Sequence, residues 1–242
     1  RELLQPYPTA LHYILFFFTM LVMMFVIYDM FAQRDNRMWS ITYSCANGRI
    51  MYAIKQTGVI VVTGAFTHTL IYWSTFIAAM LQRGGVRDLV NPVQTIETFD
   101  KFTYPWSKIK YVTVLYLISM VCIVALCITI WGVFVMFRNR VYALVTMLIF
   151  AAVEQFIYSH IDIHSVWNGL HYINIINIIN INATFSSYRN WGVGTYVFPV
   201  FSVVLFVHII CAGVIGYIAI NVSASMKPYK NTTFIKRFTD CV

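Results

Sequence analysis

The sequence predicts an all-α fold, a polytopic bundle of transmembrane helices that forms one membrane domain over 1–242. Composition is the first reason: 60% of the residues are hydrophobic and 11% are charged, whereas soluble domains average about 25% charged residues. The second reason is that the apolar residues come in long runs. The run 57–82 holds no charged residue, and at about 1.5 Å per residue it is long enough to cross a hydrocarbon layer of about 30 Å.

Five segments are apolar enough to form spans, and turn-forming residues separate them. The five segments are 11–31, 57–82, 109–137, 141–159 and 195–220. Gly213 and Gly216 in the last one are expected to let it approach a neighbouring helix closely. An odd number of spans with an outside start suggests a sixth helix ahead of Arg1, which is not an initiator methionine. The spans take up half of the chain and their connections are short, so no soluble domain of appreciable size is expected and catalysis in a water-filled domain would belong to a partner.

The region 160–194 is too polar for a simple lipid-facing span. Asn174, Asn177 and Asn180 recur at every third position, which draws a polar stripe along one face of a helix. Such a helix is tolerated at membrane depth only where protein or water covers its polar side. We therefore expect an outer re-entrant helical segment that dips partway into the membrane and returns.

Basic residues gather in the connections between the spans. If the C-terminal tail is cytoplasmic, the inside connections 32–56, 138–140 and 221–242 hold ten Lys and Arg residues, and the outside segments hold seven. The positive-inside rule therefore explains the net charge of +8 without a nucleic acid as partner. The expected surrounding is the lipid bilayer, with the chain as a multi-pass protein of the cell membrane.

The segment 47–56, NGRIMYAIKQ, is short and basic and carries an apolar stripe. We expect it to form a surface helix that lies flat on the cytoplasmic leaflet and leads directly into the span 57–82. Its charges come from Arg49 and Lys55, whose side chains suit the headgroup region.

Three motifs have counterparts, in the same order, in one known family. They are NGRIMYAIKQ before a span with Gly and Thr, the basic turn Phe137-Arg138-Asn139-Arg140, and the block WNGLHYINIINIIN followed by Tyr188-Arg189-Asn190 and a span with Pro199. Together they resemble the membrane permease subunits of type 2, exporter-class ABC transporters, especially the small kind of Gram-positive bacteria. In that family the motifs are the coupling helix, a short inner turn and an outer re-entrant region. The sequence departs from the family at its start, where the first span is absent.

The resemblance implies a mechanism and partners. Two permeases, identical or homologous, would pair, and the coupling segment 32–56 of each would rest on a separate ABC ATPase subunit, whose closure tilts the spans. The chain has no GxxxxGK[ST] motif, so ATP and Mg²⁺ would be bound by the partner and the chain itself is not expected to be an enzyme. The resemblance also implies export of a hydrophobic or amphipathic substrate, such as a peptide, a bacteriocin or a drug.

Contact with the ATPase is predicted for Arg49, Tyr52 and Lys55, with Arg34 and Arg37 as further candidates for the same face. The alternative is that these basic residues only anchor the helix end at the headgroups, because both roles need a positive charge at the membrane surface.

Glu154, His68 and Thr67 are the candidates for a translocation path. An acid within a span costs about 2–3 kcal/mol, so Glu154 should face the bundle, a cavity or the outer surface; its alternative role is that of a protonated or hydrogen-bonded carboxyl group. His68 lies mid-span among threonines whose hydroxyls can bond their own helix or a neighbouring one. Core packing is the alternative for His68, and His208 in the last span is interpreted in the same way.

His160, Asp162 and His164 form H-x-D-x-H, which on a helix puts both histidines on one face as a possible metal pair. The alternative is that they are polar residues at the outer end of a span, and we expect neither a metal nor another cofactor in this chain. Two other functions remain open. One is a structural subunit of a large membrane complex, such as an organellar respiratory assembly. The other is an intramembrane enzyme, against which stands the lack of GxSxG and HExxH motifs.

Overall fold

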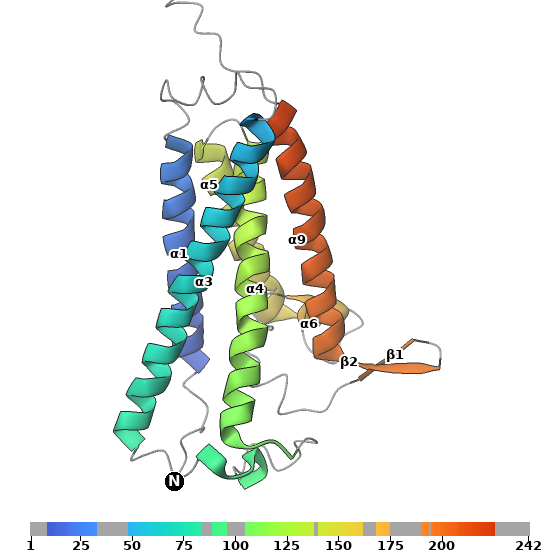
Figure 1. Cartoon of the computed structure of the whole chain (residues 1–242). Coiled ribbons are helices and arrows are strands. Elements are labelled where there is room, and N and C mark those ends of the chain that lie inside the picture. The colour runs from blue at the N-terminus through green and yellow to red at the C-terminus, as the bar shows by residue number, and fades with distance from the viewer. Residues whose placement is uncertain are drawn as a thin grey trace, which may run out of the picture.

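The protein is a bundle of long helices in a computed structural model that describes residues 9–32, 48–83, 89–95, 105–137, 140–161, 168–174, 190–193 and 195–225. The five long helices are α1 (Thr9–Ala32), α3 (Gly48–Arg83), α4 (Lys108–Met136), α5 (Arg140–His160) and α9 (Val200–Ser225). They alternate in direction, so α1 begins and α9 ends at opposite ends of the bundle (Figure 1). The predicted all-α bundle is confirmed.

Four of the helices are long and apolar enough to cross a membrane. Within the described residues these candidate spans are Gly48–Ala78, Lys108–Met136, Val141–His160 and Ser202–Ser225, and α1 adds the shorter apolar stretch Phe18–Asp29. The predicted spans 109–137 and 141–159 agree with α4 and α5 to within one residue at each end. The chain is therefore a membrane protein by length and composition of its helices.

α4 is the central helix, since it contacts each of the other four long helices. The main core is built around its large side chains, of which Ile130, Trp131 and Phe134 are almost completely buried. Each of the other long helices adds at least one buried residue to the same core: Met23 and Ile27 from α1, Ile60 from α3, Met147 from α5 and Ala219 from α9.

Two glycines bring α4 and α9 into close contact. A Cβ atom on Gly132 of α4 would collide with the Cγ2 methyl group of Ile215, and one on Gly216 of α9 would lie 3.0 Å from Cγ2 of Ile128. The prediction for Gly216 is confirmed, because small residues let membrane helices approach each other. The prediction for Gly213 is wrong: among the described residues, no other helix comes within 4 Å of the place of its Cβ atom.

A second, smaller core lies at the opposite end of α3 and α4 from Gly48. Its buried residues are Phe76 of α3, Tyr111 and Val112 of α4, and Leu89 and Val93 of the connection between the two helices. The connection contains the short 3-10 helix η3 (Val93–Thr95). Its backbone is fixed to the start of α4 by the bonds Val93 N to Trp106 O, 2.9 Å, and Lys108 N to Asn91 O, 3.0 Å. The described part of this connection, which was expected to consist of turns, therefore packs against the ends of α3 and α4.

The expectation that 47–56 forms a helix leading directly into the next span is confirmed from Gly48 onward, since α3 is one helix from Gly48 to Arg83. The expectation that this helix lies flat, at an angle to the span, is wrong. The physical reason is that its first turns pack on the bundle as the later ones do. Ala53 and Ile60 are both fully buried in the main core, and the Thr57 hydroxyl donates to the Ala53 carbonyl oxygen at 2.9 Å. The rest of the coupling segment, 32–47, lies largely outside the described residues.

Two short elements precede α9. The helix α6 (Asn168–Ile173) lies between α5 and α9 and contacts both. The strands β1 (Asn190–Val193) and β2 (Tyr196–Pro199) form an antiparallel hairpin. The last span was predicted from residue 195, but residues 196–199 are a strand, because alternating aromatic and β-branched residues favour extended backbone. Of the predicted re-entrant region 160–194, the structure describes residues 160–161, 168–174 and 190–193, and the last four form a strand and not a helix.

Candidate functional site

Side-chain hydrogen bonds and packed aromatic rings link α3 to α4, and we call this contact the α3–α4 seam. Its α3 residues are spaced four apart, so they share one helix face, and its α4 residues form a matching antiparallel row. The α3 row is Gly64, His68, Tyr72 and Phe76, with Thr69 beside it, and the α4 row is Val112, Tyr116, Ser119 and Cys127.

Three side-chain hydrogen bonds cross the seam. His68 Nε2 lies 2.8 Å from Ser119 Oγ, Thr69 Oγ1 lies 2.8 Å from the Tyr116 hydroxyl, and the Tyr72 hydroxyl donates to the Val112 carbonyl oxygen at 2.8 Å. These bonds tie the middle of α3 to the first half of α4.

Ser119 and Thr69 each have a second hydrogen-bond partner in their own helix. The Ser119 hydroxyl lies 3.0 Å from the Tyr116 carbonyl oxygen, and the Thr69 hydroxyl lies 2.7 Å from the Ala65 carbonyl oxygen. A hydroxyl group has one hydrogen to donate and can also accept, so each side chain can take part in both of its bonds. The expectation that threonines near His68 bond their own helix or a neighbour is confirmed for Thr69, which does both.

Aromatic rings cover the polar groups of the seam. The Tyr116 ring stacks on the His68 ring, with centroids 6.0 Å apart and planes 5° apart, and its centroid is 5.2 Å from that of Tyr72. The Trp73 ring meets Tyr116 at 5.6 Å and Phe76 edge-on at 5.6 Å. The hydrogen bonds therefore lie next to aromatic surface, where competing water is scarce and a bond between helices is retained.

The seam has a clear chemical meaning in a membrane. Lipid tails offer no partner for a hydroxyl or an imidazole group, so separating α3 from α4 leaves these groups unsatisfied unless another polar molecule replaces them. Each interhelical bond contributes on the order of 0.6–2 kcal/mol. α3 and α4 are thus hydrogen-bonded to each other in this structure. Polar groups of a bound molecule would replace the hydrogen bonds that are lost when the two helices separate, and would so favour their separation.

The translocation candidates lie at two different helix contacts. His68 is in the α3–α4 seam, with Thr67 half-buried next to it in α3. Glu154 is half-buried in α5, and its carbonyl oxygen accepts a 2.7 Å hydrogen bond from Asn174 Nδ2, just after α6. The structure therefore does not group the three candidates into one cluster.

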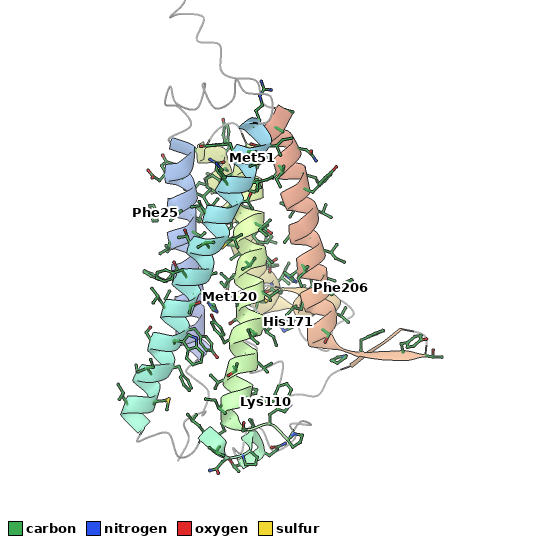
Figure 2. All side chains as sticks on the ribbon, in the orientation of Figure 1. Phe25, Met51, Lys110, Met120, His171 and Phe206 are labelled. Atoms are coloured by element: carbon green, nitrogen blue, oxygen red, sulfur yellow. The ribbon has the colours of Figure 1, made fainter. Side chains whose placement is uncertain are left out.

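The contact between α5 and α6 is built from buried polar residues. His171 and Asn174 are 8% and 3% exposed, and the His171 ring stacks on Tyr158 at 5.5 Å with planes 14° apart. Figure 2 shows His171 in the region where α6 lies beside α9. Protein thus covers Asn174, the first residue of the predicted polar stripe; Asn177 and Asn180 lie outside the described residues.

The coupling candidates form a row at the first turns of α3. Arg49, Tyr52 and Lys55 are three residues apart, which puts them along one side of the helix; Arg49 and Tyr52 are half-buried and Lys55 is exposed. They lie at the same end of the bundle as the end of α4 and the start of α5 (Figure 1). Arg34 and Arg37 lie outside the described residues.

His160 and His208 form hydrogen bonds within their own helices. His160 Nδ1 lies 2.7 Å from Ser159 Oγ, and its ring stacks on Phe156 at 4.3 Å; its proposed metal partners Asp162 and His164 lie outside the described residues. His208 Nδ1 lies 2.9 Å from the Val204 carbonyl oxygen in α9.

Sequence reasoning missed the α4 side of the seam. Tyr116 and Ser119 are the polar residues that meet His68 and Thr69, yet each stands singly in an apolar span. A signal was present, because they are three residues apart and therefore share a helix face. Without the pairing of α3 with α4, that spacing does not reveal its partner.

Comparisons of the chain with models of known protein families, with curated proteins and with solved structures give no match. The functional interpretation therefore rests on the residues and their geometry.

Proposed function

We propose that the chain is the membrane-spanning permease subunit of an ATP-driven exporter of the ABC class, placed in the cell membrane. Its substrate would be hydrophobic or amphipathic, and separate ATPase subunits would bind ATP and Mg²⁺ and hydrolyse the nucleotide. One observation carries the proposal: α3 is a single unbroken helix that joins the row Arg49, Tyr52 and Lys55 to the α3–α4 seam.

An unbroken helix can pass a displacement from one end to the other. With 36 residues and about 1.5 Å per residue, α3 is about 54 Å long, which exceeds the hydrocarbon layer of about 30 Å. Its first turns can therefore project toward a soluble partner while its middle stays at membrane depth. An ATPase that pushes on Arg49 and Lys55 in one nucleotide state would shift His68 and Thr69 relative to α4.

The seam is the part of the bundle that such a shift would open. A substrate with an apolar body and a few amide or hydroxyl groups would replace the lost hydrogen bonds of His68, Thr69 and Tyr116, and its apolar surface would stay in an apolar surrounding. In this proposal Thr67 lines the same path. Glu154 would act at the far end of α5, toward a cationic group of the substrate.

A complete transporter would contain two permeases, either identical or homologous. Apolar side chains on several helices are exposed in the single chain, among them Val62 and Phe66 of α3 and Phe156 of α5. Such surface suits contact with lipid or with a second permease equally well.

The proposal is tested first by purifying the intact complex from cells in mild detergent. We expect a protein with a Walker motif to co-purify in a fixed ratio to the chain. Recovery of many unrelated small subunits instead would support the structural role in a large membrane complex, and recovery of the chain without an ATPase would contradict the exporter.

The contact itself is tested with Arg49→Glu combined with Lys55→Glu. Reversing two charges at an interface should lower recovery of the ATPase by roughly tenfold or more, since displaced or opposed charges cost about 2 kcal/mol or more. Lys110→Glu is the control, because Lys110 is exposed, as Lys55 is, but lies at the other end of the bundle. Unchanged recovery with the α3 variant, or equal loss with the control, would refute the contact.

A further inference from the structure

The hairpin β1–β2 exposes aromatic side chains. Tyr196 is 70% exposed and Phe198 is 45% exposed, and their ring centroids are 6.3 Å apart. Because they are two residues apart in β2, they lie on the same face of the hairpin. The hairpin therefore carries two exposed aromatic side chains on one face, which we call its aromatic face.

The hairpin lies where a membrane span begins. Pro199, the last residue of β2, is followed at once by Val200, the first residue of α9, and the candidate span of α9 starts at Ser202. The hairpin contacts the bundle through β2 and α9. Figure 1 shows it extending sideways from the foot of α9, across the direction of the long helices.

The exposed surface of α9 continues toward the hairpin. Phe206, which is 63% exposed, points outward from α9 on the side toward which the hairpin extends (Figure 2). In a helix long and apolar enough to span a membrane, an outward phenylalanine presents apolar surface to whatever surrounds the bundle. Tyr196 and Phe198 thus continue the exposed apolar surface at the start of α9.

We infer that the aromatic face of the hairpin β1–β2 lies in the headgroup region of the leaflet at this end of the bundle and fixes the foot of α9 there. Tyrosine and tryptophan are enriched at this depth because their rings are apolar and their hydroxyl or N–H groups bond to water and headgroups. The partner is the lipid surface itself. Tyr196 and Phe198 carry no charge, so the attraction is apolar and should change little with salt.

The experiment places a photo-crosslinking residue on this face. The full chain with Tyr196→benzoylphenylalanine is reconstituted alone into vesicles of phosphatidylethanolamine and phosphatidylglycerol, irradiated and weighed by mass spectrometry. We expect adducts whose mass has increased by one phospholipid, in a yield comparable to that of Phe206→benzoylphenylalanine. A second variant, Phe198→benzoylphenylalanine, repeats the test if the first folds poorly. A matched control at Thr195, the exposed tip of the hairpin, should give less lipid adduct.

Each other outcome overturns the inference. Crosslinked dimers in the same vesicles would make the face a contact between two copies of the chain. A chain that recovers without any adduct would place the hairpin in water. Lipid adducts at Phe206 but not at residues 196 and 198 would separate these cases from a general failure of the chemistry, and none of the three results bears on whether an ATPase binds at Arg49.

Discussion

α4 has two faces that are held to their neighbours by different forces. Toward α9, glycines let the backbones approach, and the contact consists of close packing such as that of Gly132 against Ile215. Toward α3, hydrogen bonds such as that of His68 to Ser119 cross the contact. Burying apolar side chains between helices does not stabilise a contact in a bilayer, because the lipid is itself apolar. Contacts between membrane helices are therefore stabilised by close packing and by hydrogen bonds.

The difference shows which contact can change. Close packing depends on shape, so a shift of α9 along α4 would bring side chains into collision. Hydrogen bonds can be exchanged for bonds to another polar group with little net cost. Under the proposed function, the α4–α9 contact would be the part of the bundle that stays fixed, and the α3–α4 seam would be the part that opens.

The largest effect is expected from breaking the packed face with Gly132→Val. The new side chain would meet Ile215, whose branched side chain is stiff and cannot move aside easily, and overpacking costs about 1–3 kcal/mol. The measurement is the midpoint of unfolding by heat or by denaturing detergent. Gly213→Val is the matched control, because in the described part of the chain nothing occupies the space beside Gly213. Equal losses for both variants would mean that the α4–α9 contact is not set by glycine.

An intermediate loss of stability is expected from overpacking the apolar end of the seam at Gly64. A Cβ atom at Gly64 would lie 2.5 Å from Cys127 Sγ and 3.4 Å from Met23 Sδ, so Gly64→Ala should lower the unfolding midpoint, by about 1 kcal/mol in free energy. Cys127→Ala removes the obstructing sulfur, and the double variant should regain most of the loss. If the second substitution brings no recovery, the apolar end of the seam is looser than the structure has it.

The smallest effect is expected from the hydrogen-bonded face. A double-mutant cycle with His68→Ala and Ser119→Ala should give a coupling free energy of about 0.6 kcal/mol, the average for such bonds in membrane bundles. Ser74→Ala is the control, since the Ser74 hydroxyl bonds only within α3 among its described contacts, to Ile71 O at 3.0 Å. A coupling free energy larger than the loss of stability in Gly132→Val would contradict the proposal that the α4–α9 contact is the stronger of the two.

Hydropathy was enough to predict the long helices, because a span needs only length and apolar composition. The spans over 109–137 and 141–159 correspond closely to α4 and α5. The hairpin was missed for the same reason. Its second strand contains Tyr196, Val197 and Phe198, which are as apolar as the residues of the span that follows. Hydropathy alone does not distinguish such a strand from the start of a span. The available signal for a hairpin was Gly194 followed by Thr195 in the sequence, because glycine at the first position of a two-residue connection favours a tight turn between strands.

Contacts between helices depend on rotation, which composition does not give. Gly213 and Gly216 are three residues apart in one span, yet Gly216 meets Ile128 and Gly213 is exposed. Gly132 is the glycine that α9 approaches most closely, and nothing in its own segment distinguishes it. His68 was recognised as a candidate because an ionisable residue stands out in a span, whereas its partner Ser119 does not.

α3 contacts α1, α4 and α9 along its length and is unbroken from Gly48 to Arg83. Because α3 has no break, a movement of its first turn displaces the whole helix and changes its contacts with α1, α4 and α9 together. Tightly packed contacts tend to have a few distinct arrangements and not a continuous range. The bundle should accordingly switch in an all-or-none manner, so that intermediate positions of α3 would be short-lived and two populations would dominate.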